Sequence, residues 1–182
     1  MHKREEMIAG AAAAFETEGF RGIGVDRILS RSGASTRTFY KHFGSRDGLV
    51  LAVLEARHRE FMDRLQEEGR VGDPVGQLFD TLDRWLSDHG ARGCMLLRAR
   101  SEYAGANDSI VALVRRQKQE FEAEVATRVA VALGHPEPRV ATQIWMLFEG
   151  ATAAASVTDP SVVQAAKQAA HTLLNVARER AR

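Results

Sequence analysis

A short segment, residues 36–43, carries the side chains best suited to recognising another molecule. At about 100° per residue along a helix, its polar members gather on one face: Thr36, Arg37, Tyr40 and Lys41. A guanidinium can donate two hydrogen bonds to guanine, hydroxyls can contact base edges or phosphates, and an ammonium can bind phosphate. Because Phe39 and Phe43 fall on the opposite face, this helix is predicted to rest on a core and to present its polar face to the major groove of DNA.

The neighbouring residues predict the elements that position this helix. A preceding helix is expected from about Val25 to Arg31, and Gly33 permits a sharp reversal after it. Ser35 is placed to cap the next helix and Gly44 to end it. Two short helices joined by such a turn have the layout of a helix-turn-helix. An ordinary corner between two helices, with a basic second helix, fits the same pattern.

Basic residues are concentrated around this segment. The whole chain has a net charge of +1, which indicates no particular partner. Between Phe20 and Arg46, the single acid Asp26 lies among six bases, which gives a local net charge of +5: Arg21, Arg27, Arg31, Arg37, Lys41 and Arg46. Such a segment is suited to binding a polyanion. A basic face that is simply solvated would have the same composition.

The same region resembles the DNA-binding domain of TetR-family (tetracycline-repressor) transcription regulators. The resemblance covers about 50 residues and rests on Gly19-Phe20, Val25, Ile28, Ser32-Gly33-Ala34-Ser35, Thr38-Phe39-Tyr40-Lys41-His42-Phe43, Ser45-Arg46-Asp47 and Leu49 to Leu54. It implies seven DNA contacts: Thr36, Arg37 and Thr38 on or near bases, Tyr40 and His42 on the backbone, and Lys41 and Arg46 on phosphates.

One position departs from the family pattern. Members commonly carry Thr or Ser ahead of the first helix of the motif, where this chain has Ile23-Gly24. Glycine can still serve as an N-cap at a cost of a few tenths of a kcal/mol relative to Ser or Thr. We therefore expect the fold to be retained and a side-chain phosphate contact to be lost.

Apolar residues recur at helical spacing along the chain, which predicts an all-α fold of about nine helices. A helix-turn-helix domain is expected over 1–48 and a helical ligand-binding and dimerisation domain over 49–182. A long fourth helix begins near Ser45, and the next boundary is Gly69 to Pro74, where Asp73 can cap a new helix. Later helices are expected over Pro74 to His89, Cys94 to Tyr103, Asp108 to Leu133, Pro138 to Val157 and Pro160 to Ala181.

The last two predicted helices combine small residues with large apolar ones. Residues of this kind include Ile144, Leu147, Ala151, Ala166, Ala170, Leu173 and Leu174. The family resemblance implies that this pair of helices forms a four-helix homodimer interface, and the alternative is packing within one subunit. A dimer would place two reading helices about 34–36 Å apart on a palindromic operator.

Bulky residues of the regulatory helices are candidates for a small-molecule pocket: Phe79, Trp85, Met95, Tyr103, Phe121, Trp145, Met146 and Phe148, with Glu149 as a polar anchor. Aromatic and Met residues at helical spacing also form ordinary cores. If Glu149 lines the pocket, a cationic or hydroxylated apolar effector is expected.

No set of residues indicates an enzyme, a cofactor or a metal site. The Glu55-x-x-His58 spacing of di-iron bundles occurs once, although two copies are required. Gly19-x-x-Gly22-x-Gly24 has the wrong spacing for a dinucleotide. The lone Cys94 lies in an apolar run. With no signal peptide or membrane span visible, we expect a cytoplasmic protein.

The sequence thus favours a repressor that binds a palindromic operator as a dimer and is released by an unidentified small molecule. The fourth helix would transmit the change between the two domains. A helical protein-interaction module without DNA function is the alternative, but it leaves the basic segment unexplained.

Overall fold

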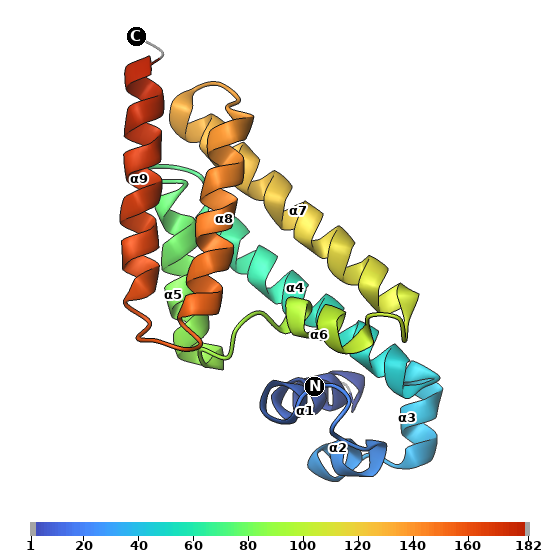
Figure 1. The fold of residues 1–182 in the computed structure, drawn as a ribbon. Coiled ribbons are helices and arrows are strands. Elements are labelled where there is room, and N and C mark those ends of the chain that lie inside the picture. Colours follow the sequence, from blue (N-terminus) through green and yellow to red (C-terminus); the bar gives the residue numbers. More distant parts are fainter. Residues whose placement is uncertain (1–2, 181–182) are drawn as a thin grey trace. The chain divides into compact units, whose positions relative to one another are not determined.

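The computed structural model describes residues 3–180, with all their side chains except those of Arg31, Ser32 and Glu68. Over this range the chain forms nine α-helices and no strand (Figure 1), which confirms the all-α prediction. The helices are α1 (Lys3–Glu18), α2 (Val25–Ser32), α3 (Thr36–Phe43), α4 (Arg46–Glu68), α5 (Gly76–His89), α6 (Met95–Tyr103), α7 (Asp108–Leu133), α8 (Pro138–Ala154) and α9 (Val162–Arg180).

The helix boundaries differ from the predicted ones by at most three residues, and the predicted end of the last helix at Ala181 lies outside the described residues. The start of α5 illustrates the source of these small differences. The Asp73 carboxylate accepts a hydrogen bond from the Gly76 amide at 2.8 Å, as the predicted capping role requires. The regular helix nevertheless begins only at Gly76, after a turn that contains Pro74. Capping residues therefore marked the helix starts to within a turn.

The first of two compact units comprises residues up to Glu60 together with Met95–Arg116. Helix α1 packs on α2, and α2 on α3. Their shared core contains Phe15, Phe20 and Phe39, each fully buried. Helix α6 belongs to this unit although it lies far along the chain, and it contributes Tyr103, whose ring meets that of Phe20 edge-on at 6.4 Å.

The second unit comprises Phe61–Cys94 and Gln117–Arg182. Within it α5, α8 and α9 lie side by side (Figure 1), and their apolar faces close over buried Phe79, Phe121 and Ile144. Packing therefore divides the chain at other places than residue 48, and α4 and α7 contribute to both units. The predicted functional division into 1–48 and 49–182 remains a prediction.

A buried arginine anchors the second unit. The Arg128 guanidinium is fully buried and donates to Glu124 at 2.7 Å, to the Pro74 carbonyl at 3.1 Å and to the Leu65 carbonyl. Glu124 also accepts two hydrogen bonds from Arg70, at 2.6 and 3.2 Å. Burial alone would raise the pKa of the Glu124 carboxyl, but the hydrogen bonds from both arginines outweigh it and hold this pKa below its usual value.

None of the helices between residues 3 and 180 has the length and apolar character needed to cross a lipid bilayer.

Candidate nucleic-acid interface

Helices α2 and α3 form the predicted helix-turn-helix. Gly33 ends α2 with φ of 60°, a left-handed conformation that favours glycine. Ser35 then caps α3, because its hydroxyl accepts a hydrogen bond from the Thr38 amide at 3.2 Å. Gly24 precedes α2 and provides no side-chain cap, as its lack of a side chain requires.

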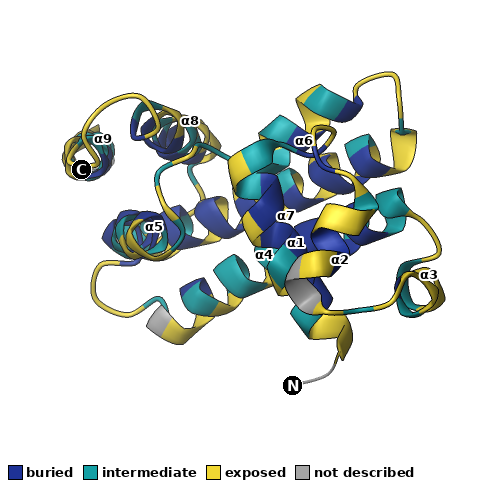
Figure 2. Ribbon diagram, turned by 90° about the horizontal axis from the view of Figure 1, so that it is seen from below, coloured by how far each residue is buried: buried dark blue, intermediate teal, exposed yellow. Residues whose placement is uncertain are grey.

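Helix α3 has one buried and one exposed face. Phe39 is fully buried, and its ring contacts that of Phe43 at 5.6 Å. On the outer side, where Figure 2 shows exposed residues in yellow, Thr36, Arg37 and Lys41 are exposed. Tyr40 is 51% exposed although its ring touches Phe39. The structure therefore brings the predicted polar groups together on one accessible face.

Two of the predicted contact residues are less accessible. His42 is half-buried, and its ring packs near Phe43. Thr38 is also half-buried, and its hydroxyl lies 2.9 Å from that of Ser35. Its hydrogen-bonding capacity is thus partly used in capping α3, so its first role is to hold the start of the helix.

Arg46 does not lie as the sequence predicts. Its guanidinium turns inward and donates to the carbonyls of Phe20 and Ile23, the latter at 3.1 and 3.3 Å, and to the Tyr103 hydroxyl at 2.9 Å. The physical reason is that the turn between α1 and α2 leaves carbonyls without helical partners, and a guanidinium satisfies several at once. In this geometry Arg46 is a structural residue rather than a phosphate clamp.

Helix α6 supplies residues that sequence reasoning missed. The Glu102 carboxylate accepts from the amides of Phe20 and Arg21 at 3.2 and 2.9 Å. Arg98 donates to the carbonyls of Phe15 and Glu16 at 2.8 and 3.1 Å. These contacts join residues more than 80 positions apart, for which no local sequence signal exists. They hold the end of α1 and the turn that leads into the helix-turn-helix.

Fewer basic side chains around α3 carry an exposed, unpaired charge than the sequence count suggests. Arg27 pairs with Glu18 at 3.2 Å and Arg46 points inward, while the side chain of Arg31 lies outside the described residues. Within the described part of the chain, Arg37 and Lys41 form no ion pair. Arg21 is also exposed, and its guanidinium donates only to the Glu102 carbonyl, so the unpaired positive charge on the described surface of this segment lies on α3 and at Arg21.

Comparison with known proteins shows which family the N-terminal segment matches and which structures share the fold. Residues 7–53 match the family model described as bacterial regulatory proteins, tetR family. The solved structure of SCO4454, a TetR-family transcriptional regulator from Streptomyces coelicolor, has a TM-score of 0.84 at 25% identity and covers 97% of this chain and 96% of its own. Residues 7–53 thus match the tetR family, and the chain has the fold of a TetR-family regulator over almost its whole length.

Curated relatives match over shorter stretches. The HTH-type transcriptional repressor AcnR of Corynebacterium efficiens is 30% identical over 89 residues, which are 48% of this chain and 47% of AcnR. The HTH-type transcriptional activator FasR of Mycolicibacterium smegmatis is 38% identical over 56 residues, 31% of this chain and 25% of FasR. The matches span less than half the length of these two relatives. Because the family consists of regulatory proteins, it agrees with the prediction that this chain is not an enzyme.

The predicted pocket residues are divided between the two compact units. Met95 and Tyr103 belong to the first unit, where Tyr103 is bonded to Arg46, whereas Phe79, Trp85, Phe121, Trp145 and Phe148 belong to the second. Met146 is 60% exposed and points away from the core.

The second unit contains an aromatic cluster made of Phe61, Trp85, Phe121 and Phe148. The ring of Phe61 lies at its centre, 5.2 Å from Trp85, 5.8 Å from Phe121 and 5.9 Å from Phe148. The sequence prediction omitted Phe61, although its place on the apolar stripe of the fourth helix could have revealed it. The indole N–H of Trp145, a half-buried residue of the same unit, is buried and has no hydrogen-bond partner in the structure.

Glu149 is paired within the protein. It accepts two hydrogen bonds from the Lys118 ammonium, at 2.6 and 2.7 Å. Burial alone would lower the pKa of Lys118, but its interactions with Cys94 and Glu149 raise it above the usual value. Lys118 is thus charged and neutralises Glu149, which removes the reason to expect a cationic effector.

Four of the seven predicted interface residues are buried inside the second unit: Ile144, Ala151, Ala170 and Leu174. Leu147, Ala166 and Leu173 are half-buried. The exposed line of α8 runs instead through Met146, Gly150 and Ala153, and that of α9 through Thr172 and Val176. The predicted interface residues therefore lie mostly on the inner faces of α8 and α9, because the sequence of an apolar helix does not reveal which side its neighbours cover.

Proposed function

We propose that this chain is a DNA-binding transcriptional regulator that reads its operator with α3. The observation that carries the proposal is the exposed polar face of a capped helix within the segment that matches the tetR family model. Arg37 provides a guanidinium for a base edge, and Thr36 and Tyr40 provide hydroxyls. Lys41 provides an ammonium for the phosphate backbone.

The regulator acts as a homodimer on a palindromic operator. Support comes from the outer faces of α8 and α9, where Met146 is 60% exposed and Val176 39% exposed beside small residues. A second copy packed there would bury these side chains and allow close approach at Gly150 and Ala153. Two copies of α3 would then read two half-sites about one helical turn of DNA apart.

A small molecule bound against the aromatic cluster releases the DNA. The cluster offers apolar surface, and the buried Trp145 indole N–H of the same unit offers a donor. For such a ligand to lower DNA affinity, it must bind more tightly to the conformation that does not fit the operator. Repression is proposed because AcnR, which is similar over more of this chain than the activator FasR, is a repressor.

In-vitro selection of bound DNA from a random pool tests the proposal. We expect a palindromic consensus whose affinity falls steeply with salt. Arg37→Ala should weaken binding to the consensus by about 1–3 kcal/mol and relax the preference at one base per half-site. The matched control Arg84→Ala removes an exposed arginine from α5 and should leave DNA affinity unchanged. Equal affinity for selected and random DNA at every salt concentration would support the interaction-module alternative instead.

A further inference from the structure

The second unit has a cavity away from the aromatic cluster. It has a volume of about 650 Å³ and lies between the loop before α5, the end of α7 and the last turns of α9. Pro74 and Leu174, both buried, form part of its wall, and Val131 is 51% exposed at its edge. Small-molecule sites in proteins commonly have volumes of about 300–1,000 Å³, so a compact organic ligand fits this space.

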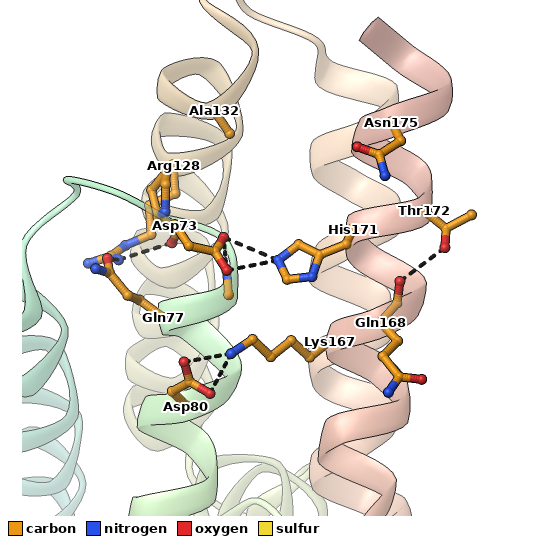
Figure 3. Close-up of polar contacts among 12 residues, drawn as sticks. Asp73, Gln77, Asp80, Arg128, Ala132, Lys167, Gln168, His171, Thr172 and Asn175 are labelled. Carbon is orange, nitrogen blue, oxygen red and sulfur yellow. Dashed lines mark hydrogen bonds and ion pairs between the residues drawn. The ribbon is translucent and has the colours of Figure 1, made fainter. Parts of the chain in front are cut away.

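The acid that lines this cavity is already paired. Asp73 lies 2.9 and 3.2 Å from the His171 ring, as Figure 3 shows, and accepts from the Gly76 amide. Burial alone would raise the pKa of the Asp73 carboxyl, but these hydrogen bonds outweigh it and hold this pKa below its usual value. Asp80, seven residues further along and within α5, is likewise paired with Lys167 at 2.7 Å (Figure 3). Asp73 and Asp80 therefore each have a basic partner within the protein.

The cavity has two arginines, of which Arg70 is paired with an acid and Arg178 is not. Arg70 shares Glu124 with the buried Arg128, so two guanidinium groups face one carboxylate. Arg178 donates to the Asn175 side-chain oxygen at 3.2 Å and to the Ala132 carbonyl at 3.0 Å, both neutral acceptors. Among residues 3–180, no carboxylate lies within ion-pair distance of Arg178. The cavity thus has an excess of positive charge.

We propose that this cavity binds a small organic anion, a carboxylate with an apolar body. The guanidinium groups of Arg178 and Arg70 bind the carboxylate. Val131 and Leu174 contact the apolar body. The bound anion would connect α9 to the loop before α5 and to the end of α7. This site does not depend on the proposed DNA-binding function.

Titration of the full-length chain with benzoate tests the site, and benzamide serves as the uncharged ligand of the same shape. Arg178→Met removes the unmatched guanidinium, and Arg180→Met is the control because it changes the net charge equally from an exposed position outside the cavity. We expect benzoate to raise the melting temperature of the wild type and of Arg180→Met. Arg178→Met should bind benzoate about tenfold more weakly, as expected for loss of a charge-assisted contact.

Nuclear magnetic resonance of the histidine rings shows where the anion binds. Benzoate should shift the resonances of His171, which lines the cavity, and leave those of His42, which belongs to α3 in the first unit, unchanged. The proposal would be overturned if Arg178→Met and Arg180→Met bound benzoate with equal affinity. It would also be overturned if the wild type responded to benzamide as strongly as to benzoate, or if it bound no benzoate at all.

Discussion

The exposed face of α3 and the Arg128 anchor use the same functional group in opposite ways. Arg37 has its guanidinium in solvent with no partner in the described structure, whereas every contact of Arg128 is made inside the second unit. An exposed polar group contributes little to folding, so it is available for a ligand. A buried charge must be paired, and removing its partner is costly. The position of a guanidinium therefore decides whether it serves binding or stability.

The largest effect is expected where the buried charge loses its partner. Glu124→Gln leaves Arg128 and Arg70 without a counter-ion and should reduce the free energy of unfolding by about 3–5 kcal/mol. Chemical denaturation measures this as a lower midpoint at unchanged slope. Glu122→Gln, at an exposed position of the same helix, should change the free energy by no more than about 0.5 kcal/mol. Similar values for the two variants would contradict the anchoring role of Glu124.

Acid should weaken the same anchor in the unmodified protein. Because the pKa of Glu124 is lower in the folded chain than in the unfolded chain, its ionised form stabilises the fold at pH values above its unfolded pKa. This contribution is lost as the pH falls through the folded pKa. The melting temperature should drop over that range, and less steeply in Glu124→Gln. A drop of equal steepness in the two proteins would assign the acid sensitivity to other groups.

Arg46 is intermediate between exposed Arg37 and buried Arg128, since it is half-buried and hydrogen-bonded to backbone carbonyls. Arg46→Met should destabilise the protein by about 1–3 kcal/mol, because carbonyls of Phe20 and Ile23 lose a donor. If Arg46 is structural, the salt dependence of DNA binding should keep its slope. A slope that falls by about one would show that Arg46 neutralises a phosphate after all.

The smallest effect on stability is expected for the exposed face. Lys41→Ala should change the free energy of unfolding by no more than about 0.5 kcal/mol, yet weaken binding to all DNA sequences alike and reduce the salt slope by about one. Binding isotherms at several salt concentrations measure both quantities. If Lys41→Ala lost as much stability as Arg46→Met, the exposed and the internal basic residues would not differ in their contribution to folding.

The sequence by itself determined the local features. Ser35, Gly33 and Gly44 set the limits of α3 through capping and glycine conformations that depend on a few neighbouring residues. The two faces of α3 follow from the helical repeat alone, so the partition between Phe39 and Arg37 was predictable.

Tertiary structure decided what depends on contacts across long sequence distances. It turned Arg46 towards Tyr103, packed Glu102 of α6 against the turn after α1, and paired Glu149 with Lys118. It also selected the exposed side of α8, with Met146 outside and Ile144 inside. The physical reason is that burial and pairing depend on which elements meet in space, and a helical repeat contains no information about its neighbours.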